Sequence, residues 1–127
     1  MKVSDQLPPN YSDIASTFQL SGFNAVFTYG DTLYNPTGLE VSEDLMAHEE
    51  VHAKQQTNPE EWWSRYLVDP EFRLSQELEA YKAQYKWFSD KPRPERRWFL
   101  REFAKNLSSK LYGGIINKAQ AEELIKQ

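Results

Sequence analysis

The sequence contains no cysteine and only two histidines. Without cysteine there is neither a disulfide framework nor a thiolate metal site, so any zinc ion must be bound by histidine and carboxylate. No apolar run is long enough to span a membrane, and the N-terminus lacks the apolar segment of a secretory signal peptide. We therefore expect a cytoplasmic protein with no membrane partner, and packaging into a virion is compatible with the same absence.

The chain also lacks a strong overall charge, because its net charge is only −4 over 127 residues. The charges are unevenly distributed: residues 1–90 carry 15 acidic and 6 basic side chains, whereas residues 91–127 carry 4 acidic and 9 basic. The basic run is short and interrupted by proline and glutamate, which favours a helical scaffold that complements the acidic part over docking on an acidic partner or nucleic acid. The length predicts one domain over residues 1–127, with residues 91–127 as its basic helical scaffold.

Both histidines lie in one short motif, His48-Glu49-Glu50-Val51-His52, which has the form H-E-x-x-H. On a helix, residues four apart lie on the same face, so the imidazoles of His48 and His52 can reach one metal ion. Glu49 lies about 100° around the helix from His48, where a carboxylate can reach a water on the same ion. The spacing predicts a zinc site with Glu49 as general base. The alternative is a solvated helix that carries these residues by chance.

The segment before the motif predicts a small sheet. Residues 24–29 and 32–34 are rich in β-branched and aromatic side chains and are separated by the turn signal Gly30-Asp31, which is typical of a hairpin. Residues 1–13 are expected to be an extended arm, because they include two adjacent prolines. A short helix capped by Ser12 or Asp13 is expected to run to about Leu20. The sequence thus predicts a helix-rich α+β fold with a β-hairpin before the motif helix.

The motif helix and the next one have recognisable ends. Ser42 is a good N-cap for the motif helix, and Asn58-Pro59 would end it. Asp69 as N-cap and Pro70 at the first position predict another helix to about Phe88. Between these helices lies a short aromatic helix or turn, for which a place in the core is favoured over a wall of a substrate cleft. Its large side chains are Trp62, Trp63 and Tyr66.

Glu77 is the candidate for a third metal ligand. It lies on the apolar stripe of the predicted 70–88 helix, whereas Glu79 lies roughly opposite. The stripe consists of Leu74, Leu78, Tyr81, Tyr85 and Phe88. A carboxylate on an apolar stripe must be paired or bound to a metal. Metal binding is favoured because two histidines alone leave a zinc site one ligand short. The alternative is an ion pair between Glu77 and Arg73, one turn earlier.

These motifs resemble those of zincin-type zinc metallopeptidases. The metzincin branch would need a third histidine soon after His52, which this chain lacks, whereas Glu77-Leu78-Glu79-Ala80-Tyr81 resembles the E-x-x-A-[DY] signature of short gluzincins. The resemblance covers about residues 25–85. It implies a minimal zincin-like domain in which His48, His52 and Glu77 hold one Zn²⁺ per chain. It also implies a sheet beside the motif helix, with an edge strand that holds the substrate backbone.

The chemistry that follows is hydrolysis of a peptide bond in a peptide or protein substrate. Zinc would lower the pKa of a bound water, and Glu49 would take its proton and pass it to the leaving amine. Tyr81 stands where the family pattern often has an aspartate, and its hydroxyl could accept a ligand histidine's N–H or donate to the oxyanion. Tyr85, Tyr66 and Arg73 are further candidates for the oxyanion role, and the sequence does not choose among them.

Residues 94–109 are expected to form a further helix, followed by a last short helix capped by Asn117. The inward side chains expected on the 94–109 helix are Trp98, Phe99, Phe103 and Leu107. Three classes of function compete. The favoured one is a zinc peptidase, with a phage or bacterial source suggested by the small size. The others are a catalytically silent zinc-stabilised interaction or phage structural module, and a metal-free helical binding domain. A silent module would be free to lose Glu49, which this chain retains.

Overall fold

A computed structural model describes residues 1–18 and 25–127. Within these residues the chain forms α-helices and one small sheet near the N-terminus, which confirms the predicted helix-rich α+β class. The helices are α1 (Tyr11–Phe18), α2 (Glu43–Gln55), α3 (Pro59–Val68), α4 (Pro70–Trp87), α5 (Arg93–Leu107) and α6 (Lys118–Lys126), with a 3₁₀ turn η1 (Lys110–Tyr112).

The sheet has the order β1-β3-β2. Strands β2 (Phe27–Tyr29) and β3 (Thr32–Tyr34) form the predicted antiparallel hairpin. The expected arm over residues 1–13 is wrong at both of its ends, because Lys2–Ser4 forms β1, which pairs with β3 in parallel, and α1 already begins at Tyr11. The backbone of residues 2–4 is extended, but it is hydrogen-bonded within the sheet. The expected helix end at Leu20 and the strand start at residue 24 lie outside the described residues.

Caps and prolines set the starts of the helices around the motif. Asn58 and Asp69 accept a backbone N–H of the first turn, from Glu61 and Phe72 respectively, and a proline opens both α3 and α4. Ser42 occupies the N-cap position of α2 as predicted, but its side chain makes no capping hydrogen bond. The last helix, α6, begins with a complete capping box at Asn117.

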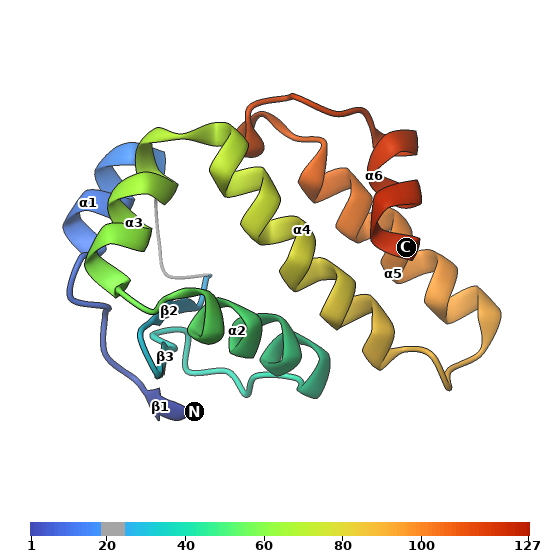
Figure 1. Ribbon diagram of the computed structural model, residues 1–127. Coiled ribbons are helices and arrows are strands. Elements are labelled where there is room, and N and C mark those ends of the chain that lie inside the picture. The colour runs from blue at the N-terminus through green and yellow to red at the C-terminus, as the bar shows by residue number, and fades with distance from the viewer. Residues whose placement is uncertain (19–24) are drawn as a thin grey trace.

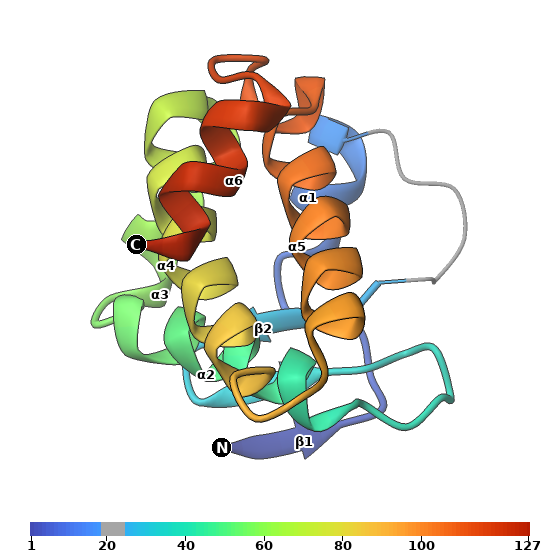
Figure 2. The same ribbon diagram turned by 90° about the vertical axis from the view of Figure 1, so that its right-hand side faces the viewer.

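Helix α4 is the centre of the molecule. In Figure 1 it crosses the view diagonally, with α2 beneath it and α5 and α6 on its other side. Its most extensive packing is against α2, which in turn contacts β2 of the sheet. Figure 2 shows α4, α5 and α6 as neighbouring helices, with strands β1 and β2 in the lower part of the view. Helix α2 therefore lies between the sheet and α4, and the motif residues lie in this layer.

The apolar core has two parts. One joins α4, α5, η1 and α6 around Phe88, Phe103 and Leu107, and the other joins α1, β2 and α3 around Ile14 and Trp63. The aromatic residues of α3 are buried in this second part, and they also line the cavity described below, so the structure fits both of the positions considered for them. One expectation is wrong: Trp98 is 55% exposed, and Leu100 takes the inward place on α5 instead. In the described part of the chain, no helix is both long and apolar enough to cross a membrane.

Candidate metal centre

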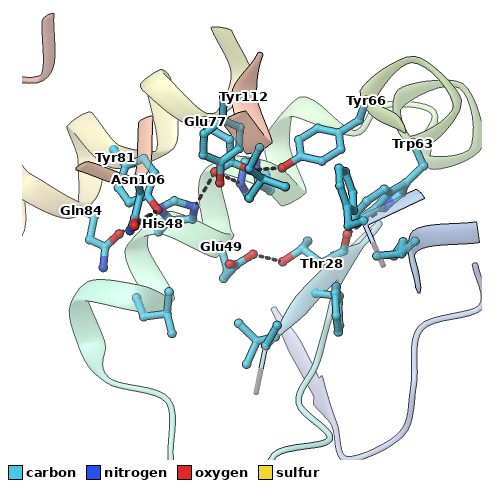
Figure 3. A pocket seen from close by; sticks show the side chains of 18 of the residues that line it. Thr28, His48, Glu49, Trp63, Tyr66, Glu77, Tyr81, Gln84, Asn106 and Tyr112 are labelled. Atoms are coloured by element: carbon cyan, nitrogen blue, oxygen red, sulfur yellow. Dashed lines mark hydrogen bonds and ion pairs between the residues drawn. The ribbon is translucent and has the colours of Figure 1, made fainter. Parts of the chain in front are cut away.

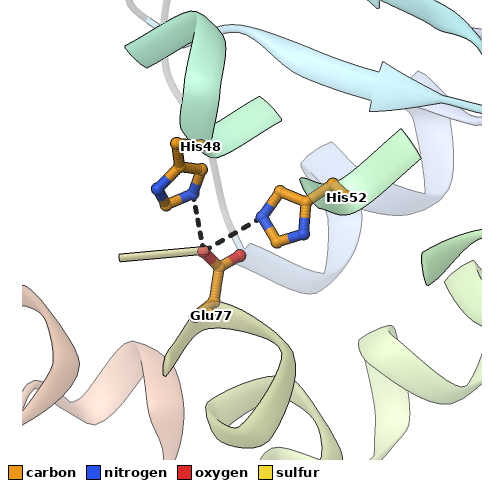
Figure 4. A group of neighbouring side chains, drawn as sticks. All are labelled: His48, His52 and Glu77. Carbon is orange, nitrogen blue, oxygen red and sulfur yellow. Dashed lines mark hydrogen bonds and ion pairs between the residues drawn. The ribbon is translucent and has the colours of Figure 1, made fainter. Parts of the chain in front are cut away.

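His48, His52 and Glu77 meet between helices α2 and α4. One nitrogen of each histidine and one carboxylate oxygen lie within 4.8 Å of one another, and all three residues are buried. The Nε2 atoms of His48 and His52 are 3.0 and 3.2 Å from the same oxygen, Oε1 of Glu77. Figure 4 shows both rings pointing from α2 towards this oxygen on α4. The predicted ligand set is thus brought together by the packing of two helices.

Two glutamines set which nitrogen of each ring carries a proton. Nδ1 of His48 lies 2.9 Å from Oε1 of Gln84, whose Nε2 donates to Asp44, so the Gln84 oxygen must face the ring. Nδ1 of His52 lies 2.8 Å from Oε1 of Gln55, whose Nε2 donates to the backbone oxygen of Gln76. A carboxamide oxygen only accepts hydrogen bonds, so each Nδ1 is the donor. In the neutral rings, both Nε2 atoms therefore present lone pairs.

Three electron-rich atoms consequently converge on one buried point. The two Nε2 lone pairs and Oε1 of Glu77 would repel one another unless a positive charge lies between them. A divalent metal ion satisfies all three at once, and protonation of a histidine is the alternative source of charge. The donor set of two imidazoles and one carboxylate is one that catalytic zinc sites use. The residues therefore fit a metal ion of this kind.

The pKa values of the ligands reflect the same arrangement. Burial alone would lower the pKa of His52, but the facing Glu77 carboxylate outweighs it and raises that pKa to about 9. Burial alone would raise the pKa of Glu77, but the two histidines hold it well below its ordinary value. Without a metal, a proton on His52 thus provides the positive charge that the cluster requires. Protons and metal ions compete for the same lone pair.

The second oxygen of Glu77 is held by Tyr66. The Tyr66 hydroxyl donates to Oε2 of Glu77 at 2.5 Å, and burial, followed by the Glu77 charge, keeps the pKa of this hydroxyl well above its ordinary value. The alternative partner, Arg73, does not contact Glu77. Its guanidinium donates instead to the backbone oxygens of Tyr66, Leu67 and Leu111. Glu77 is therefore fixed by Tyr66, with Oε1 directed at the histidines.

Glu49 lies in the same cavity as the three ligands (Figure 3). Its Oε2 accepts a hydrogen bond of 2.7 Å from the hydroxyl of Thr28 on β2. Both residues are buried, at 6% and 2% exposed. Within residues 1–18 and 25–127, no group donates a hydrogen bond to Oε1 of Glu49, which leaves one carboxylate oxygen able to accept a proton.

The cavity has a volume of about 430 Å³ and lies between the two parts of the core. Three of its lining residues, Ala25, Asn106 and Leu111, are themselves exposed, so the cavity reaches the surface beside them. Among the described lining residues, Glu49 and Glu77 are the only carboxylates, and no lysine or arginine is present. The rest of the wall is mostly aromatic and aliphatic.

Tyr81, which was predicted as one candidate for an oxyanion role, lines the cavity. Its ring packs edge-on against His48 at 4.6 Å between centroids, and its hydroxyl oxygen accepts a hydrogen bond from Asn106 at 3.2 Å. Burial, with the Glu77 charge adding to it, raises the Tyr81 pKa well above its ordinary value, so the hydroxyl keeps its proton. Tyr66 and Arg73 are engaged elsewhere, and Tyr85 does not line the cavity.

The edge of the sheet nearest α2 is occupied by side chains of the chain itself. The carboxamide of Gln56 accepts from the N–H of Gly30 at 2.7 Å and donates to the backbone oxygen of Thr28 at 2.9 Å. The indole of Trp63 donates to the same Thr28 oxygen at 3.0 Å. A substrate backbone therefore cannot pair with β2 at these two groups, which limits the role that the resemblance implied for the edge strand.

Several residues of the site were not found by sequence reasoning. Thr28, Gln84, Asn106 and Tyr112 reach the cavity from β2, α4, α5 and η1. Gln84 carried one usable signal, because it follows Glu77 by two helical turns and so lies on the same face of α4. The other three lie far from the motif in sequence, and only the packing of their elements brings them to the site.

The comparisons with known proteins add no family. No protein-family model, curated protein or solved structure matches this chain. The geometry of the cavity and its side chains is therefore the basis for any functional assignment.

Proposed function

We propose that this protein is a zinc-dependent hydrolase that cleaves peptide bonds, similar in chemistry to the zincins that its motifs resemble. One observation carries the proposal: two imidazole lone pairs and a carboxylate oxygen converge on a single buried point. Gln84, Gln55 and Tyr66 hydrogen-bond to the ligand atoms that do not face this point, namely the two Nδ1 atoms and Oε2 of the carboxylate. Such outer partners are typical of sites that bind a metal, because they fix the tautomer and direction of each ligand.

Zinc is the metal that this donor set favours. His48, His52 and Glu77 would be three protein ligands, which is the number that catalytic zinc sites use while keeping a position open. When bound, the ion supplies Lewis-acid polarisation of a carbonyl group and makes a water molecule more acidic. The cavity beside these ligands would have room for both water and substrate.

The side chains of the chain itself would carry the proton and hold the charge. Glu49, whose Oε1 has no hydrogen-bond donor among the described residues, accepts a proton from the attacking water and then delivers it to the nitrogen of the departing amine. The Tyr81 hydroxyl, whose oxygen accepts from Asn106, donates its proton in a hydrogen bond to the carbonyl oxygen as negative charge develops there. The attack adds water across the C–N bond and releases a carboxylic acid and an amine.

The wall of the cavity supports a peptide as the substrate. It contains no basic side chain among the described residues to bind a phosphate or a carboxylate, and it is rich in aromatic and aliphatic groups. An uncharged peptide segment with apolar side chains suits these walls. A peptide or protein is therefore the partner that this proposal implies.

Glu49→Gln tests the proposal, with Glu50→Gln as its control on the neighbouring, exposed position. Protein purified without added metal is first analysed for metal content, and one zinc per chain is expected. Cleavage is then followed on an unstructured protein substrate and a mixed peptide library. Glu49→Gln should retain zinc and lose about 10²–10⁴-fold in rate, the usual contribution of a general base, whereas Glu50→Gln should cleave like the unaltered protein.

Two results would contradict the proposal. A chain that binds zinc but cleaves neither substrate would instead be a metal-stabilised interaction module. A chain that does not bind metal would instead be a metal-free helical binding domain.

A further inference from the structure

We infer that Thr28 is a positioning residue that orients Glu49 for proton transfer. This inference rests on the proposed function and assigns a role to a residue on β2, outside the motif helix. The Thr28 hydroxyl donates to Oε2 of Glu49 at 2.7 Å across the interface between the sheet and α2. In Figure 3 a dashed line marks this hydrogen bond between Thr28 on β2 and Glu49 on α2.

The hydrogen bond makes the two oxygens of Glu49 unequal. A carboxylate can rotate about its last bond, and only some of its orientations direct an oxygen at a proton donor in a fixed place. Thr28 engages Oε2, so Oε1 is the oxygen left without a donor from the described residues. The Thr28 hydroxyl has a single proton, which it shares in the hydrogen bond to Oε2 of Glu49. Thr28 is therefore not the source of the proton that Glu49 takes up during the reaction.

Thr28 is suited to this task because its own position is fixed. Its backbone oxygen accepts from both Gln56 and Trp63, and its residue pairs with Leu33 within the sheet. Threonine also has a stiff first side-chain torsion, which restricts where the hydroxyl can point. At 2% exposed, Thr28 does not exchange this hydrogen bond with bulk water. The sheet thus fixes the carboxylate of Glu49 on α2 through the hydroxyl of Thr28.

A matched pair of substitutions separates this role from packing. Thr28→Val keeps the branched shape and removes the hydroxyl, whereas Thr28→Ser keeps the hydroxyl and removes a methyl group. With the zinc-loaded full chain and a cleaved peptide, Thr28→Val should lower kcat about 10- to 100-fold, the usual effect of a hydrogen bond to a charged group. KM and zinc content should change less than about twofold, since no ligand is touched. Thr28→Ser should stay within about threefold of the unaltered protein.

A double substitution tests whether Thr28 acts through Glu49. If it does, adding Thr28→Val to Glu49→Gln should reduce the residual rate by less than about twofold, because the general base that Thr28 orients has already been replaced. A full additional 10- to 100-fold loss would overturn the inference. So would equal kcat values for Thr28→Val and the unaltered protein, or equal losses in Thr28→Val and Thr28→Ser.

A readout independent of turnover is the position of the carboxylate. Crystal structures of the three proteins should show Glu49 on the threonine or serine hydroxyl in the unaltered chain and Thr28→Ser, and rotated or spread over several positions in Thr28→Val. If the protein cleaves no peptide yet these structures differ as expected, the proposed function fails, and only the structural part of the inference stands, namely that the Thr28 hydroxyl fixes the Glu49 carboxylate. If Glu49 keeps its place in Thr28→Val, the positioning role fails whatever the activity.

Discussion

Glu77 uses its two oxygens for two different partners. Oε1 faces both histidines, and Oε2 accepts from Tyr66. The carboxylate is 6% exposed, and removing one partner of such a buried charged group leaves the others uncompensated. In a metal-bound protein, the same carboxylate would supply the only negative charge among the three ligands. Its loss should therefore reduce metal affinity more than any change on the opposite face of α4.

Glu77→Ala and Glu79→Ala provide this comparison. We expect Glu77→Ala to weaken zinc binding by at least about 100-fold, because a three-ligand site becomes a two-ligand site. Glu79 is exposed on the same helix, so Glu79→Ala should bind zinc like the unaltered protein. Titration against a competing chelator of known affinity measures both. Equal losses in the two variants would refute the assignment of Glu77.

The same residues show how far sequence reasoning reaches. Glu77 was predictable because a carboxylate on an apolar helical face requires a partner, and that rule depends only on local periodicity. Thr28 was not, because a threonine in a short strand is ordinary and its partner Glu49 lies 21 positions away. Periodicity identifies the inward face of an element but does not identify the residue that faces it across an interface. The inward face itself can also be misjudged: the large apolar side chain of Trp98 favours the interior, but Trp98 is 55% exposed on α5.

At the scale of elements, the three candidate metal ligands come from two helices. His48 and His52 come from α2 and Glu77 from α4, and this pair of helices makes the most extensive contact in the fold. The hairpin before α2 and the start of α4 were predictable from turn and capping residues, whereas Asn58 and Pro59 were interpreted only as the end of the motif helix and also begin α3. The contact between α2 and α4 was predictable only through the expected ligand set. The pattern of one helix indicates its inward face but does not indicate which other helix packs against that face.

Chelation at several pH values tests whether a bound metal connects α2 to α4. A ligand that binds only the folded state stabilises it, by about 4 kcal/mol at a thousandfold excess over its dissociation constant. In the metal-free protein, the raised pKa of His52, about 9, gives a stabilisation that is fully present below the ordinary histidine pKa and is lost as pH rises through about 9. Removing metal should therefore lower the melting temperature most near pH 9 and least near pH 5, where protons displace the metal.

Thermal melts with and without chelator at pH 5, 7 and 9 measure the effect. The expected order is a shift that increases with pH. No shift at any pH, in a protein shown by elemental analysis to contain zinc, would mean that the metal does not connect α2 to α4.

At the scale of the whole molecule, Arg73 joins segments from both parts of the core. Its guanidinium donates to the backbone oxygens of Tyr66 and Leu67 at the end of α3 and of Leu111 in η1. The cation also lies over the ring of Phe18, at 4.8 Å from its centroid. Buried arginines of this kind satisfy several carbonyl groups that would otherwise have no donor. One side chain thus ties α1, α3, α4 and η1 together.

Arg73→Met should destabilise the protein by about 2–4 kcal/mol, because three carbonyl acceptors lose their donor while the apolar stem is kept. Arg101→Met, at an exposed position of α5, is the control and should change the free energy of unfolding by less than about 0.5 kcal/mol. Urea denaturation of the metal-free chain at one fixed pH measures both without a contribution from bound metal. Similar stabilities for the two variants would show that Arg73 is not a structural tie.

The side chain of Gln56 has a consequence for how separate copies of this molecule behave towards one another. A sheet edge with unpaired N–H and C=O groups is a template on which another chain can build, and small open sheets are exposed to this hazard. Here the carboxamide of Gln56 takes up Gly30 N–H and Thr28 C=O as a neighbouring strand would, and it is itself 5% exposed. On the β2 edge these two groups are therefore not available to a strand of another molecule, so this side of the sheet can border an open cavity without offering them as a template for aggregation.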